Sequence, residues 1–279
     1  MEQLALAVSS MPALTLDQLD ELWTATARHD AKFLLSQAEL LELIVALGDG
    51  TAVLEIGQRR AFSYRTEYFD TADRAMYLHH VQKKLRRVKI RERIYMDSGL
   101  AQLEIKAREG TSQTHKDVLL QSRGLDERSR KFVSEFMHPK QNGSHAADAA
   151  EVLHEEVAYE EVAHEDGGSN DLVSSAVTHF TRITLFVPSS TEKITIDLNL
   201  TLEVGGQSVK ANPDIALVEV KSLDHASHTV TQLRRLGLHP TQFSKYCSAI
   251  DLLASPRPRV HTRRTLERIF AATSHELTN

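Results

Sequence analysis

The chain has 279 residues, of which 41% are hydrophobic and 25% charged, a composition typical of a globular protein rather than a disordered or fibrous one. No stretch approaches the roughly 18 consecutive apolar residues of a membrane-spanning helix, and the N-terminus lacks the basic start of a signal peptide. The single cysteine, Cys247, excludes an internal disulfide and fits a reducing compartment. These features predict a cytoplasmic protein.

The net charge of −5 hides two segments of opposite sign. Residues 146–166 carry eight carboxylates and no Lys or Arg, and setting these eight negative charges aside leaves the rest of the chain at +3. Residues 83–93 carry seven basic side chains against one acidic one, Glu92. A positive focus of this kind favours a polyanionic ligand.

The N-terminal part of the chain is predicted to be helical. The first thirty residues contain leucines at helical spacing, with Thr15 as a candidate N-cap. A further helix is predicted to begin after Ser36, which forms a capping box with Glu39, and to end at Gly48. From residue 51 onwards the hydrophobic period changes from 3.6 to 2, which indicates strands.

The rest of the chain is predicted to be mostly strands. We expect them near residues 53–57, 62–71, 88–95, 101–107, 180–187, 192–202 and 215–221, with helices near residues 125–137, 229–236 and 263–270 and a short helix after Tyr246 that ends at Leu253. Residues 121–178 interrupt the strands and include the acidic stretch, so we interpret them as an insertion. This insertion is either a solvated surface excursion or an acidic lid or docking segment.

Several predicted strands carry charge opposite their apolar face. One face of residues 87–95 carries Arg87, Lys89, Arg91 and Arg93, and the other carries Val88, Ile90 and Ile94. The charged faces contain Arg87, Lys89, Arg91, Arg93, Glu104, Lys106, Arg182, Lys193, Asp197, Glu219 and Lys221. A sheet with one solvated face has the same pattern. Because neighbouring like charges on one strand repel each other, we favour a closed barrel whose polar lumen binds an anion.

The residue types indicate a phosphate chain. Arg binds phosphate through two parallel hydrogen bonds, and Lys binds it as a point charge. The interspersed Glu residues suggest a divalent cation between carboxylate and phosphate, since Mg²⁺ and Mn²⁺ prefer oxygen ligands. The chain has no Walker loop, HExxH motif or CxxC pair. No aromatic residues are interleaved with the basic cluster, which argues against nucleic acid as a partner.

Seven segments in this order resemble the VTC domain, the polyphosphate polymerase domain of the CYTH-like triphosphate tunnel metalloenzymes. They are RHDAKF from Arg28, YRTEYFDT from Tyr64, KIRERIY from Lys89, LEIK from Leu103, ITID from Ile194, VEVK from Val218 and FSKY from Phe243. The resemblance covers residues 28–253 except for the insertion at 121–178. It leaves an N-terminal helical extension at 1–27 and a basic C-terminal tail helix at 254–279.

The resemblance implies an α+β fold, an antiparallel β-barrel tunnel with a polar basic lumen, braced by helices. It also implies that the γ-phosphoryl group of ATP is transferred to a polyphosphate chain with Mn²⁺ or Mg²⁺ as cofactor. The implied catalytic residues are Arg91, Arg93, Lys106, Arg182 and Lys245, the phosphate-binding residues Lys32, Lys89, Lys193 and Lys221, and the metal ligands Glu219 and Glu104. ATP and polyphosphate are the expected partners, and a separate membrane protein would be needed to couple synthesis to translocation.

Two alternatives remain open within the resemblance. The tunnel could hydrolyse tripolyphosphate or a nucleoside triphosphate, with Glu104 or Glu219 as the base. It could also bind polyphosphate or an inositol polyphosphate without catalysis, as a sensor. Lys193 stands where the family has Arg, and Phe180 where it has Tyr. Asp197 is expected either to orient an arginine or to bind the metal.

Overall fold

The structure, a computed structural model, describes residues 2–24, 29–110, 113–137, 172–223, 227–255 and 260–270. The acidic stretch at 146–166, whose role is open between surface excursion and lid, lies outside these residues. The chain divides into two compact units. The first unit comprises Met1–Tyr68, Arg93–Leu100 and Ser174–Asn279, and the second unit comprises Phe69–Glu92 and Ala101–Val173.

The first unit is built on a sheet with the strand order β2-β11-β9-β8-β4. These strands are β2 (His29–Ser36), β11 (Ile215–Ser222), β9 (Glu192–Val204), β8 (Val173–Val187) and β4 (Phe62–Asp70). The pairs β2–β11, β11–β9 and β9–β8 are antiparallel. Two short strands, β3 (Ala52–Leu54) and β10 (Gln207–Lys210), extend this sheet beside β8 and β9, and β1 (Ala13–Leu14) pairs in parallel with β3.

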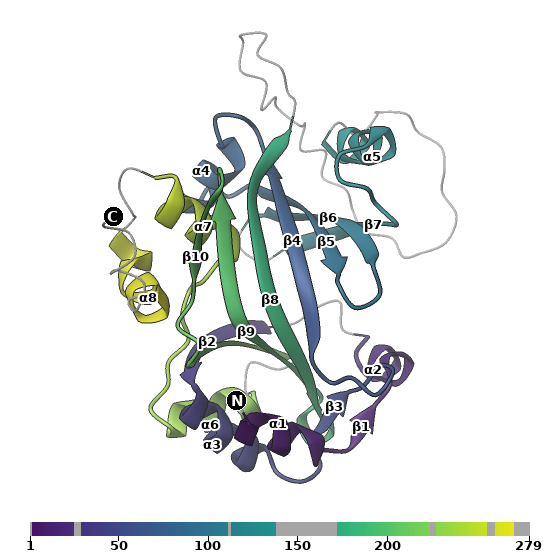
Figure 1. Cartoon of the computed structure of the whole chain (residues 1–279), viewed down its shortest axis with the longest axis vertical. Coiled ribbons are helices and arrows are strands. Elements are labelled where there is room, and N and C mark those ends of the chain that lie inside the picture. Colours follow the sequence, from purple (N-terminus) through teal and green to yellow (C-terminus); the bar gives the residue numbers. More distant parts are fainter. Residues whose placement is uncertain are drawn as a thin grey trace. The chain divides into compact units, whose positions relative to one another are not determined.

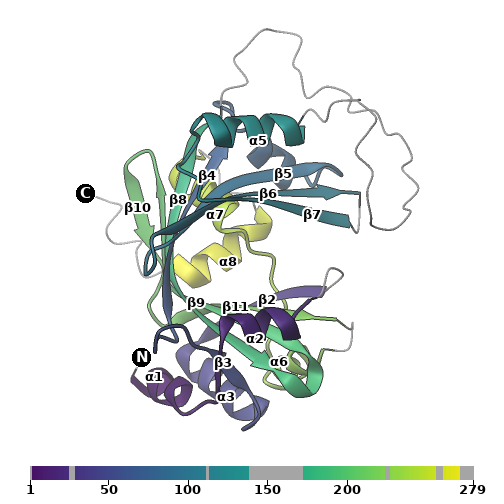
Figure 2. The same ribbon diagram turned by 90° about the vertical axis from the view of Figure 1, so that its right-hand side faces the viewer.

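One face of this sheet is apolar and is covered by helices. The strands contribute Phe33, Ile183, Ile194, Ile196 and Val218 to a core that also includes side chains of the helices. The helices are α1 (Glu2–Ser9), α3 (Gln37–Leu47) and α6 (His228–Arg235). Figure 2 shows them together on one side of β2, β9 and β11. Because apolar side chains alternate with polar ones along a strand, this packing directs the charged residues to the opposite face.

Helix α7 (Lys245–Leu253) packs against β9 and β10. Its Tyr246 ring stacks on Tyr68 of β4, with the centroids 5.1 Å apart, and the Tyr246 hydroxyl lies 3.0 Å from the Ser175 hydroxyl. Ser244 caps the helix by accepting a hydrogen bond from the Cys247 amide. The first residue of α7 is thereby fixed beside the sheet. Helix α8 (Val260–Phe270) follows it (Figure 1).

Both predicted helix starts at the N-terminal end are confirmed. Ser36 and Glu39 form the capping box that begins α3, and Gly48 follows its last residue with φ of +81°. Thr15 caps α2 (Leu16–Leu22) and forms a capping box with Gln18. These caps satisfy backbone N–H groups that have no partner within the helix.

The described part of the second unit contains the strands β5, β6 and β7, in that order, and two helices. They are α4 (Ala75–Val81), β5 (Arg87–Tyr95), β6 (Leu100–Glu109), β7 (Gln113–Leu120) and α5 (Glu127–Met137). Val133 of α5 packs on Ile90, Leu103 and Ile105 of the strands. Strands at the division contribute residues to both units.

The YFDT segment of the resemblance has a structural role at its aspartate. Asp70 is fully buried and accepts hydrogen bonds from the backbone amides of Thr71, Met76 and Tyr77, at 2.8 to 2.9 Å. It therefore satisfies the amides at the start of α4, where Arg74 has a left-handed φ of +61° and makes no side-chain cap.

The predicted α+β class with an antiparallel sheet is confirmed by these elements. The predicted insertion at 121–178 is too long, because β8 begins at Val173 rather than near residue 180. Neither β7, whose first five residues are all polar, nor α4, which is only seven residues long, was predicted. Short or polar elements of this kind have weak periodicity.

Candidate functional site

Charged side chains from four neighbouring strands share the polar face of the first unit. In the strand register, Lys32 of β2 lies opposite Glu219 of β11, and Glu219 lies opposite Thr195 of β9. Asp197, two residues further along β9, lies opposite Arg182 of β8. Glu219 and Asp197 are therefore diagonal neighbours on one face, close enough for their surroundings to interact.

Asp197 holds two basic side chains. Its Oδ1 accepts a hydrogen bond from Nε of Arg182 at 2.6 Å. Its Oδ2 accepts one from Nη2 of Arg182 at 2.8 Å and another from Nζ of Lys245. The aspartate side chain is only 4% exposed. Its contacts are those expected of a residue that orients an arginine, one of the two roles predicted for it.

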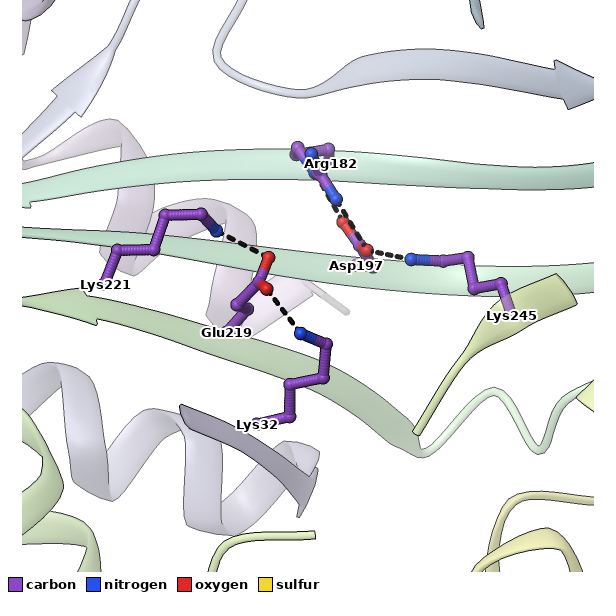
Figure 3. A network of polar contacts seen from close by, with 6 residues as sticks. All are labelled: Lys32, Arg182, Asp197, Glu219, Lys221 and Lys245. Carbon is purple, nitrogen blue, oxygen red and sulfur yellow. Dashed lines mark hydrogen bonds and ion pairs between the residues drawn. The ribbon is translucent and has the colours of Figure 1, made fainter. Parts of the chain in front are cut away.

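Glu219 lies between two lysines. Lys32 Nζ donates to Oε1 and Lys221 Nζ donates to Oε2. Figure 3 shows each carboxylate of the site between two basic side chains. Four cations thus surround two carboxylates, which leaves an excess of two positive charges on a largely buried face. Buried charge without a counter-charge is unfavourable, so this arrangement is suited to an anion.

The pKa values of the network show which of its side chains are charged at neutral pH. Burial lowers the pKa of Lys245 to about 8, although Asp197 acts to raise it. Burial also lowers the pKa of Lys221. Burial alone would raise the pKa of both carboxyl groups, but the neighbouring cations outweigh it and hold the pKa of Asp197 and of Glu219 well below the usual range. Both carboxylates are consequently ionised at neutral pH.

Lys193 and Lys221 lie directly opposite each other on β9 and β11. Two like charges in that position repel each other. Lys193 Nζ lies 5.3 Å from the centroid of the Trp23 ring, and this cation–π contact partly compensates for the repulsion. Trp23, which is the only tryptophan of the chain, follows α2.

The family follows from a comparison with family models. The model described as the VTC domain matches residues 27–254. The chain belongs to the VTC domain family. The match confirms the resemblance carried by the seven sequence segments. The antiparallel sheet is consistent with the tunnel fold, but the described strands form an open order from β2 to β7 rather than the expected closed barrel. None of the curated proteins compared with the chain matches it.

Solved structures with a similar fold share little sequence with this VTC domain. A candidate adenylate cyclase from Bacillus halodurans is 13% identical with a TM-score of 0.44, over 82% of this chain and 98% of that one. A candidate adenylyl cyclase from Hippeastrum, described as having a dominant triphosphatase activity, is 15% identical with a TM-score of 0.44 over the same shares. A candidate adenylate cyclase from Vibrio parahaemolyticus is 10% identical with a TM-score of 0.41, over 78% and 96%.

The predicted site residues of the VTC domain fall into two groups, one in each unit. The first unit contains Lys32, Arg93, Arg182, Lys193, Glu219, Lys221 and Lys245, and the second contains Lys89, Arg91, Glu104 and Lys106. Within the first unit, Glu219 brings Lys32 and Lys221 together. Asp197 brings Arg182 and Lys245 together.

In the second unit Glu104 is the centre of a separate set of ion pairs. Its carboxylate is 1% exposed and accepts from Arg91 Nε at 2.5 Å and from Lys116 Nζ at 2.7 Å. Lys106 lies opposite Lys116 in the β6–β7 register. Burial, together with the nearby positive charge of Lys89, lowers the pKa of His80 to about 3. Lys116 was missed because the strand that carries it was not predicted.

The carboxylates do not form a complete metal site by themselves. Among the residues that the structure describes, no three His, Cys, Asp or Glu side chains are grouped so as to hold a metal ion. The family implies a divalent cation, and such cations often bind through one or two carboxylates while substrate phosphates supply other ligands. Glu219 presents two carboxylate oxygens to this face, each of which accepts a hydrogen bond from a lysine.

In the part of the chain that the structure describes, no helix has the length and apolar character needed to span a membrane.

Proposed function

We propose that this VTC domain transfers the γ-phosphoryl group of ATP to a growing polyphosphate chain, with Mn²⁺ or Mg²⁺. The observation that carries the proposal is the pair of carboxylates, Asp197 and Glu219, surrounded by four cations on one buried face. Phosphoryl transfer requires positioning and neutralisation of charge more than covalent chemistry by the protein. A fixed excess of positive charge supplies both.

Arg182 is proposed to bind the transferring phosphoryl group. Two of its five N–H donors are used by Asp197, and these two bonds fix the plane of the guanidinium. The remaining donors are available for phosphate oxygens in a defined orientation. Lys245, which donates to the same carboxylate, adds a positive charge from the start of α7.

Glu219 is proposed to hold the divalent cation, with Lys32 and Lys221 as its partners in the absence of substrate. When bound, the cation would neutralise charge on the phosphate chain. The two lysines, released from the carboxylate, would then contact phosphate oxygens. Glu104 is proposed as a supporting carboxylate within the second unit, where Arg91 and Lys116 hold it.

The proposal is tested by incubating the purified full chain with ATP and Mn²⁺, separating the products by gel and measuring ADP and free phosphate. A ladder of polyphosphate with matching ADP is the expected result. Free phosphate without polymer would establish the hydrolase instead. Tight tripolyphosphate binding without turnover would establish a binding or sensor domain. The variant Arg182→Ala, which should make no polymer, controls for a contaminating kinase.

A further inference from the structure

Two aromatic rings lie stacked in the middle of the candidate site. Tyr64 of β4 and Phe180 of β8 have centroids 5.2 Å apart and are parallel to within 1°. The Tyr95 ring is tilted against Tyr64 at a centroid distance of 5.1 Å. All three belong to the first unit. We call the stacked pair of Tyr64 and Phe180 the aromatic platform.

Three cations of the site lie over the aromatic platform. The guanidinium carbon of Arg182 is 5.4 Å from the Tyr64 centroid and 5.2 Å from that of Phe180. The guanidinium carbon of Arg93 is 5.7 Å from the Tyr64 centroid, and Lys245 Nζ is 4.2 Å from the Phe180 centroid. All of these distances are within the range of a cation–π contact.

A ring holds a cation differently from a carboxylate. Asp197 cancels one of the two charges of Arg182 and Lys245 and occupies some of their N–H donors, and Glu219 does the same for Lys32 and Lys221. A ring attracts a cation through its quadrupole and leaves the formal charge uncompensated. Cations placed over rings can therefore be close together and still carry charge toward an anion.

We infer that the aromatic platform positions Arg93, Arg182 and Lys245 so that all three act on one phosphate group. Tyr64 is the positioning residue at its centre, since its ring contacts two arginines from different strands and the ring of Phe180. The inference rests on the proposed function only in taking a phosphate chain as the ligand. Burial is the main cause that raises the pKa of the Tyr64 hydroxyl, which stays protonated at neutral pH.

The ring of Tyr64, rather than its hydroxyl, performs this role, and two variants distinguish the contributions of the two groups. Tyr64→Phe retains the ring, and Tyr64→Leu removes it. The measurement is the dissociation constant of tripolyphosphate without metal, by calorimetry, together with kcat and KM for ATP. We expect Tyr64→Leu to weaken tripolyphosphate binding about tenfold, as loss of desolvated cation–π contacts implies. Tyr64→Phe should bind within about twofold of the wild type because its ring has the same quadrupole.

Tyr68→Leu is the matched control. Tyr68 lies on the same strand as Tyr64, and its ring stacks on Tyr246, so its loss removes a comparable stacking contact. Because Tyr246 is next to Lys245 in α7, this variant should weaken tripolyphosphate binding slightly, and clearly less than Tyr64→Leu does. Equal weakening in Tyr68→Leu and Tyr64→Leu would overturn the inference, because the effect would then be general destabilisation. Wild-type affinity in Tyr64→Leu, or equal weakening in Tyr64→Phe, would also overturn it.

The outcomes distinguish this inference from the proposed function. If the wild type makes no polymer but its tripolyphosphate affinity depends on the Tyr64 ring, the platform stands and the polymerase fails. If the wild type makes polymer and Tyr64→Leu behaves as the wild type, the platform fails and the polymerase stands. A wild type that does not bind tripolyphosphate contradicts both.

Discussion

Lys245, the first residue of α7, donates a hydrogen bond to the carboxylate of Asp197, which lies 48 residues earlier on β9. The carboxylate raises the pKa of the lysine and burial lowers it, and burial is the larger effect, so the pKa is about 8 rather than 10.5. The charge of Lys245 can therefore change near physiological pH.

Affinity for tripolyphosphate should depend on pH through Lys245. Below pH 8 the lysine is protonated and attracts phosphate, and above pH 8 it loses its charge, so affinity should weaken as pH rises through about 8. Calorimetric titrations between pH 6.5 and 9.5 measure this. Lys245→Arg should remove the decline, because Arg stays charged over that range. Lys131→Arg, at an exposed position of α5, should retain it. An unchanged decline in Lys245→Arg would assign it to another group.

Removing the charge of Asp197 should destabilise the fold. Asp197→Asn leaves Arg182 and Lys245 buried without a carboxylate, and breaking a buried pair in this way costs about 3 kcal/mol or more. Urea denaturation, monitored by circular dichroism, measures the free energy of unfolding. Saturating tripolyphosphate should restore more stability to the variant than to the wild type, because the anion replaces the missing charge and should therefore bind the variant more tightly. A loss below about 1 kcal/mol would contradict this account of Asp197.

Glu219→Gln should have opposite effects on binding and on turnover. Without the carboxylate, Lys32 and Lys221 lose their counter-charge, so metal-free tripolyphosphate should bind more tightly. Polymer synthesis with Mn²⁺ should fall about 100-fold, since one ligand of the cation is lost. Calorimetry and the ADP assay measure the two effects separately. Tighter tripolyphosphate binding with unchanged polymer synthesis would show that Glu219 is a structural counter-charge and not a ligand of the cation.

Arg91→Ala and Arg93→Ala should each lower turnover about 100-fold while the fold stays intact, as for loss of an electrostatic contact in the transition state. The rate of ADP release and the circular dichroism spectrum measure these two properties. Arg59→Ala is the matched control, because Arg59 is exposed and its ion pair with Asp97 includes none of the predicted site residues. Near-normal turnover in both variants would exclude these arginines from the reaction.

Much of the fold could be predicted because its signals are local. Thr15 and Ser36 begin helices through contacts with residues three positions later. The alternation along β5 and β9 predicted which face is charged, since side chains on a strand point to opposite sides. The polar strand β7 could not be predicted in the same way, because its first five residues lack an apolar face and its pairing with β6 alone defines it as a strand.

The candidate site was predicted as a set of residue types but not as a set of contacts. The seven segments identified the family, the basic side chains and Glu219. They did not indicate that Tyr64 would lie under two arginines, because nothing near it in sequence marks it as different from a core aromatic residue. Trp23 was missed for the same reason, since its contact with Lys193 joins a loop to a distant strand.

By itself the sequence determined the α+β class, the capped helices, the charged strand faces and the family, because caps, alternation and motifs are each contained within a few residues. Only the tertiary structure decided which cation meets which carboxylate. Lys32 and Glu219 are 187 residues apart in the chain and become partners through the β2–β11 register. Register follows from packing the apolar faces of all strands together, and a shift by one residue would direct every charge of the site into the core.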